Sequence, residues 1–215
     1  MSISALKKLR FFAPGVIAAL GYFILGEFTG WWSQPDELSF EDLPKILPVF
    51  VVGVIYYVTP LRDRSNRKYF ERVSENIRQG LYRIYGRDDI NPEDWARVRV
   101  VFFQLIDSDE SLREKAKIAY FNGAIWTTVA DVRIISWIYA VISLVLFVLL
   151  GNTGALLAFI SFSAISLVTY PISNELTKKH MEIGDEQLTL IESTHKIRLV
   201  KKLDALHGRE NTAGT

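Results

Sequence analysis

The chain has 215 residues, 49% of them hydrophobic, and its mean hydropathy of +0.16 is high for a soluble protein of this size. It contains no cysteine, which excludes disulfides, thiolate catalysis, Fe–S clusters and cysteine-ligated zinc. The net charge of +1 gives no direct signal for nucleic acid or for an acidic partner.

The hydrophobic residues gather in four segments, and the charged side chains lie almost entirely outside them. A soluble core would instead mix apolar and polar positions at a period of 2 or 3.6. This separation predicts an all-α integral membrane protein with four transmembrane helices. The segments are residues 11–32, 43–60, 134–150 and 154–170. No small-x-small cleavage site follows the first segment, so we expect it to be retained and not removed as a signal peptide.

Basic residues indicate the orientation of these spans. The central region, residues 61–133, holds 14 of the 25 Lys and Arg residues, and the tails at both ends are also basic. The loop after the first segment and the GNTG turn at 151–154 hold none. By the positive-inside rule, we expect the N-terminus, the central region and the C-terminus to face the cytoplasm. The predicted location is the inner (plasma) membrane of the cell.

The central region and the C-terminal tail are predicted to form a helical cytoplasmic layer. One helix should continue out of the second segment and end near Gly86, a second should begin at Asn91, and a third should begin at Asp107 and lead into the third segment. Pro171 should break or kink the chain after the fourth segment. An amphipathic helix should follow and dock on the central region, on another subunit or on the membrane.

These features divide the chain into four parts. Residues 1–60 hold the N-terminal tail and the first two spans, and residues 61–133 the cytoplasmic helical region. Residues 134–171 form a transmembrane hairpin. Residues 172–215 form the amphipathic helix and a disordered end.

Basic side chains follow the second segment directly, at the expected depth of anionic lipid head groups. They either bind lipid or serve only to set the topology. They are Arg62, Arg64, Arg67 and Lys68.

Glu27 is the single carboxylate in the first apolar segment, so we consider a pore or interface role beside that of an interfacial acid. Small residues on the first and fourth segments allow close helix contacts, within one chain or in a homo-oligomer. Those retained as interface candidates are Gly26, Gly30 and Ala158.

Residues 120–133 are apolar but carry Asn122, Asp131 and Arg133. Three roles fit such a segment: lining a vestibule, packing the helical layer, or holding a partner. The apolar faces of the central and C-terminal helices are further candidates for binding a soluble partner. Their residues are Trp95, Leu188, Ile191 and Leu199.

No motif for catalysis or cofactor binding is present. The acidic clusters have no EF-hand pattern, and the spacing of the three histidines suits no helical metal pair, so we expect neither a metal nor a cofactor. The sequence therefore favours a non-enzymatic, oligomeric membrane platform that binds a soluble cytoplasmic protein or ligand. It could be the membrane component of a bacterial stress or antiviral defence system. The alternatives are a gated channel or membrane-perturbing effector, and a membrane-embedded enzyme or transporter.

Overall fold

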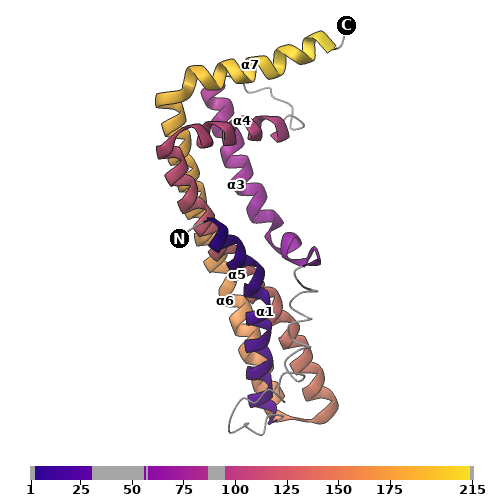
Figure 1. Ribbon diagram of the computed structural model, residues 1–215. Helices are drawn as coiled ribbons and strands as arrows, with labels where there is room; N and C mark the ends of the chain where they lie inside the picture. The colour runs from indigo at the N-terminus through magenta and orange to yellow at the C-terminus, as the bar shows by residue number, and fades with distance from the viewer. Residues whose placement is uncertain (1–2, 31–55, 57, 87–94, 214–215) are drawn as a thin grey trace. The chain divides into compact units, whose positions relative to one another are not determined.

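The structure is a computed structural model that describes residues 3–30, 56, 58–86 and 95–213 (Figure 1). These residues form helices and, within these ranges, no strand. In chain order the helices are α1 (Ile3–Thr29), α3 (Leu61–Tyr85), α4 (Trp95–Ser108), α5 (Glu110–Leu150), α6 (Thr153–Leu190), the π-helix η3 (Ile191–His195) and α7 (Lys196–Ala213).

Three of the described helical stretches are long and apolar enough to cross a membrane: Arg10–Thr29, Glu110–Leu150 and Thr153–Leu206. They contain most of the first apolar segment of the sequence and all of the third and fourth. The second segment, residues 43–60, lies outside the described residues except for Tyr56 and residues 58–60. The all-helical prediction is confirmed for the described residues, and the fourth span stays a prediction.

Local sequence explains most of the helix ends. Helix α3 is followed by Gly86, whose φ of 80° suits a glycine after a helix C-terminus. Helix α5 begins after Asp109, whose Oδ1 accepts a hydrogen bond from the Leu112 amide at 3.0 Å. The N-cap is therefore Asp109, and not Asp107 as the sequence suggested. The start predicted at Asn91 lies outside the described residues.

The GNTG turn joins α5 to α6 as expected. Gly151 has a φ of 65°, and Asn152 caps α6 by accepting a hydrogen bond from the Ala155 amide at 3.0 Å. Pro171 does not break the chain, because α6 continues through it to Leu190. Helix α7 extends to Ala213, into the segment that the sequence suggested was disordered.

The chain divides into two compact units. The first, which we call the apolar unit, comprises Met1–Lys68 and Ala124–Glu175; the second, the polar unit, comprises Tyr69–Gly123 and Leu176–Thr215. Helices α3, α5 and α6 each contribute to both units.

In the apolar unit, α1 packs against the α5–α6 hairpin. The Tyr139 hydroxyl donates a hydrogen bond to the Ala18 carbonyl at 2.6 Å, and its ring stacks on that of Phe162. At the turn end, the Asn152 side chain donates to the Thr29 carbonyl at 3.1 Å. A Cβ at Gly154 would collide with the Phe28 backbone, so the α1 and α6 backbones approach closely there.

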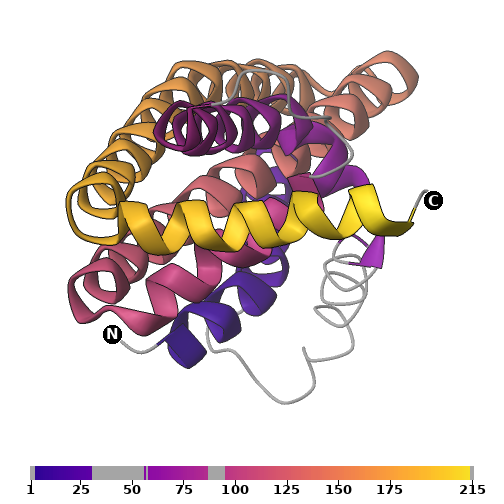
Figure 2. The same cartoon turned by 90° about the horizontal axis from the view of Figure 1, so that it is seen from above.

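The polar unit has an apolar core of its own. Its buried residues come from α3, α4, α5, α6, η3 and α7, and fully buried members include Leu81, Val98, Leu105, Leu112, Ile191, Leu199 and Leu203. Figure 2 shows α4 beside α7. The Arg198 side chain donates to Ser108 at 2.9 Å and Lys202 donates to Gln104, so α4 and α7 run antiparallel. The tail thus docks on the central region, the first of the three places that the sequence allowed.

A candidate functional site in the apolar unit

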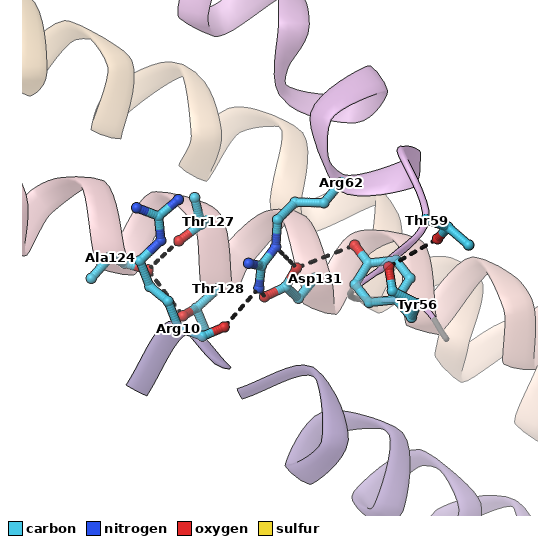
Figure 3. Close-up of polar contacts among 8 residues, drawn as sticks. All are labelled: Arg10, Tyr56, Thr59, Arg62, Ala124, Thr127, Thr128 and Asp131. Carbon is cyan, nitrogen blue, oxygen red and sulfur yellow. Dashed lines mark hydrogen bonds and ion pairs between the residues drawn. The ribbon is translucent and has the colours of Figure 1, made fainter. Parts of the chain in front are cut away.

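A buried ion pair joins α3 to α5 inside the apolar unit (Figure 3). The Arg62 Nε donates to Asp131 Oδ1 at 2.7 Å, and its Nη2 donates to Asp131 Oδ2. Arg62 is 8% exposed and Asp131 is fully buried. Two parallel bonds from one guanidinium to one carboxylate are the strongest geometry for such a pair.

Two further chain segments meet at this pair. The Tyr56 hydroxyl donates to Asp131 Oδ1 at 3.2 Å, and Arg62 Nη2 also donates to the Arg10 carbonyl at 3.1 Å. In Figure 3 all these groups point into one small region between the helices. The cluster therefore ties α1, the segment before α3, α3 and α5 together through buried polar contacts.

A second buried arginine lies close by in sequence, on α5. The Arg133 Nε donates to Thr169 Oγ1 at 3.0 Å, and its Nη2 donates to the Thr169 carbonyl at 3.3 Å and to Ser173 Oγ. Its guanidinium lies 4.4 Å from the centre of the Tyr170 ring, a distance that allows a cation–π contact. Arg133 thus holds the inner faces of α5 and α6 together.

Removing two charges from water costs several kcal/mol per ion, and this cost is offset only when the charges neutralise each other and their hydrogen bonds are satisfied. The Arg62 and Asp131 pair meets both conditions. Neither side chain is exposed enough to meet a bulky ligand directly. The observed arrangement suits a structural junction between helices better than an open binding pocket.

The four predicted lipid-binding residues fall into two groups. Arg64, Arg67 and Lys68 are exposed on α3, as a contact with lipid head groups requires. Arg62 is buried in the ion pair, so its guanidinium is turned to Asp131 and not to the surface. The reason is tertiary: the buried face of the first turn of α3 meets a carboxylate that lies 69 residues away in the sequence.

The interface candidates of the first and fourth segments are also divided. Glu27 is exposed on α1, and Gly30 follows its last turn with a φ of 72°. Gly26 and Ala158 are buried within the chain itself. Because Ala158 belongs to the core of the apolar unit, it supports packing inside one chain. The homo-oligomer stays a prediction, and Ala158 gives no support for it.

The predicted partner-binding residues lie in or against the core of the polar unit. Leu188, Ile191 and Leu199 are at most 2% exposed, and Trp95 packs against the same core from its edge. This location differs from the partner contact that the sequence suggested. The prediction that these residues form one apolar stripe is confirmed, but helices of the same chain cover this stripe.

The polar unit also has a side-chain clasp at the start of α5. The His195 Nε2 lies 3.0 Å from Asp109 Oδ2, so η3 is linked to the N-cap of α5. The Leu112 amide and the His195 side chain hold the pKa of Asp109 below its ordinary value. A π-helical turn is uncommon and often occurs at functional positions, and here it marks the connection from α6 to α7.

Sequence reasoning missed the charged cluster, although it singled out the segment that carries Asp131 and Arg133. The available signal was the presence of two ionisable residues just before an apolar run, which argues for buried partners. It did not identify Arg62 or Tyr56 as partners of Asp131, since no periodicity connects them.

The fold and the cluster define an all-α protein with several helices compatible with a membrane and with buried charges in the apolar unit. Comparison with known proteins adds nothing to this class: no protein-family model, no curated protein and no solved structure matches the chain.

Proposed function

We propose that the protein is a multi-pass membrane protein whose polar unit is a non-enzymatic docking platform on the cytoplasmic side. The observation that carries this proposal is the separate apolar core of the polar unit. Helices α5 and α6 leave their apolar segments without interruption and contribute Leu112 and Leu188 to that core. A mere connector between spans would not need a packed body of this kind.

The contacts inside the apolar unit support a fourth span. The C-terminal end of α1 lies at the α5–α6 turn, where Asn152 binds the Thr29 carbonyl. The Arg10 carbonyl and Tyr56 both lie at the opposite end, beside Asp131. Residues 131 and 150 of α5 are separated by 19 residues, or about 28 Å of helix. Thr29 and Tyr56, the described residues on either side, thus lie at opposite ends of a distance close to the thickness of a bilayer core, and this supports the proposed fourth span.

The exposed basic residues of α3 support the orientation. Arg64, Arg67 and Lys68 follow Arg62, which lies at the same end of the apolar unit as Arg10 and Asp131. We propose that these three side chains contact anionic head groups of the inner leaflet. Each such residue contributes about 1 kcal/mol of attraction when it lies near the surface.

The outward face of α4 is the surface proposed for the soluble partner. Val100 and Phe103 are 53% and 47% exposed, whereas Val98, Val101 and Leu105 are buried in the core. Arg99 is also exposed on this helix. This chemistry fits a protein segment that presents apolar side chains flanked by acidic ones, because the acidic groups would complement Arg99.

Fusion reporters test the topology. Green fluorescent protein at the C-terminus should fluoresce in bacteria, whereas alkaline phosphatase at the same position should be inactive. Alkaline phosphatase inserted in the 151–154 turn should be active. The opposite pattern would contradict both the orientation and the even number of spans.

Site-specific photocrosslinking in cells of the native host tests the platform. A photoreactive amino acid at Phe103 should give a discrete adduct with one soluble protein, identified by mass spectrometry, and Arg99→Glu should weaken it. The matched control is Ile197 on α7, which is 87% exposed but lies outside the proposed surface. Adducts that are the same at both positions would overturn the docking surface.

Ion flux into liposomes tests the alternative of a channel. The platform should conduct nothing, with or without the crosslinked partner. A flux that the partner opens and that Glu27→Gln reduces would replace the platform by a gated channel, because Glu27 is the exposed carboxylate of α1.

A further inference from the structure

Asn66 is a fully buried polar residue of α3 in the apolar unit. Neither its Oδ1 nor its Nδ2 has a hydrogen-bond partner among the residues that the structure describes. An asparagine side chain can donate two hydrogen bonds and accept two. Burying both atoms without partners leaves the desolvation of each group uncompensated, so native proteins rarely tolerate it.

The other asparagine buried in the described part of the chain behaves differently. Asn122 is 4% exposed, and its Nδ2 donates to the Leu176 carbonyl at 3.0 Å and lies 3.2 Å from His180 Nδ1. The fold can therefore provide protein partners for the NH2 group of a buried asparagine. At Asn66, in contrast, no polar group of the described residues bonds either atom of the amide.

Asn66 follows Arg62 by four residues, so both lie on the same buried face of α3, one helical turn apart. Arg62 is held in the ion pair with Asp131 on that face. The polar layer around the pair thus continues along α3 for at least one more turn.

We propose that Asn66 is the protein side of a buried hydration site, in which one or two internal water molecules bond its amide beside the Arg62–Asp131 layer. Water fits because the amide needs both a donor and an acceptor, which one water supplies. Full burial excludes a lipid head group or any larger ligand. Buried waters commonly make about three hydrogen bonds to otherwise unsatisfied groups.

The substitution Asn66→Leu tests this site, because leucine has a similar size but no polar atoms. Loss of a hydration site leaves the other partners of the water unsatisfied, so the Tm in detergent should fall by about 2–8 °C. If the amide has no water, leucine removes two unsatisfied groups, and the Tm should rise or stay unchanged. That result would overturn the proposal. Asn122→Leu is the matched control and should lower the Tm in either case.

A second measurement decides the question if Asn66→Leu does not fold. A density map of the wild-type protein at high resolution should show an ordered peak at about 2.7–3.2 Å from an amide atom of Asn66. A map with ordered side chains and no such peak would refute the hydration site.

Discussion

Both units have buried apolar residues, but they differ in the charges that they bury and in the side chains that they expose. The apolar unit buries Asp131 and Arg133 and exposes residues such as Phe12, Val148 and Leu149. The polar unit buries leucines such as Leu105 and Leu203 and exposes most of its charges. A bilayer favours exposed apolar surface and disfavours unpaired polar groups, whereas water favours exposed polar groups and disfavours exposed apolar surface. The difference is compatible with the proposal that the apolar unit meets lipid and the polar unit meets water, with α5 and α6 contributing to both units.

The ion pair of the apolar unit gives the largest expected effect. Asp131→Ala leaves the Arg62 guanidinium buried without its carboxylate, and should lower the free energy of unfolding by about 3–5 kcal/mol. The double substitution Arg62→Met with Asp131→Leu should recover most of this loss, because it removes both charges. Thermal unfolding in detergent measures both variants. A double variant as unstable as the single one would show that mutual neutralisation is not the role of the pair.

A lysine placed on each unit tests the comparison of solvents directly. Ile160→Lys puts a charge on a 55% exposed position of α6 in the apolar unit, and should cost about 2.5–3.5 kcal/mol if that surface faces lipid. Ile197→Lys, on α7 in the polar unit, should change stability by less than about 0.5 kcal/mol. The yield of membrane-inserted protein and its Tm report the difference. Equal effects at the two positions would contradict the assignment of lipid to one unit and water to the other.

Two glycines test how tightly each unit is packed. Gly154→Ala should cost about 1–3 kcal/mol, because the added Cβ meets the backbone of Phe28, which cannot move easily. Gly123→Ala should be neutral or stabilising by up to about 1 kcal/mol, since its Cβ would lie 3.9 Å from the His180 ring, an ordinary van der Waals contact, among the described residues. Both are read as shifts in Tm. Destabilisation of equal size would mean that helix contact at Gly154 is not specially close.

The smallest expected effect is a pH dependence in the polar unit. The Leu112 amide and His195 lower the pKa of Asp109, so its contribution to stability is present above the ordinary aspartate value of about 3.9. This contribution is lost as the pH falls through the lowered pKa. Asp109→Asn should therefore flatten the fall in Tm between about pH 5 and pH 3 relative to wild type. Identical profiles for the two proteins would contradict a role for the charge.

The sequence alone was sufficient for features that depend on neighbouring residues. The length of an apolar run, the glycine after α3 and the GNTG turn each specify local structure directly, and they appear where they were expected. The periodic stripe of Leu188, Ile191 and Leu199 also predicted a buried helix face correctly. Pro171 was predicted to break or kink the chain, and the break is not observed, because α6 continues through it to Leu190.

Tertiary structure decided what those faces meet. Arg62 reads as a topology or lipid signal in the sequence, yet it is buried because α3 brings it to a carboxylate 69 residues away. The stripe of the C-terminal tail could have faced a partner, and is instead covered by α3 and α4 of the same chain. Sequence periodicity shows that a helix face is apolar, or that a charged residue interrupts an apolar face, because both features depend on residues within a few helical turns. The identity of the opposing group depends on contacts between distant segments, which only the folded chain brings together.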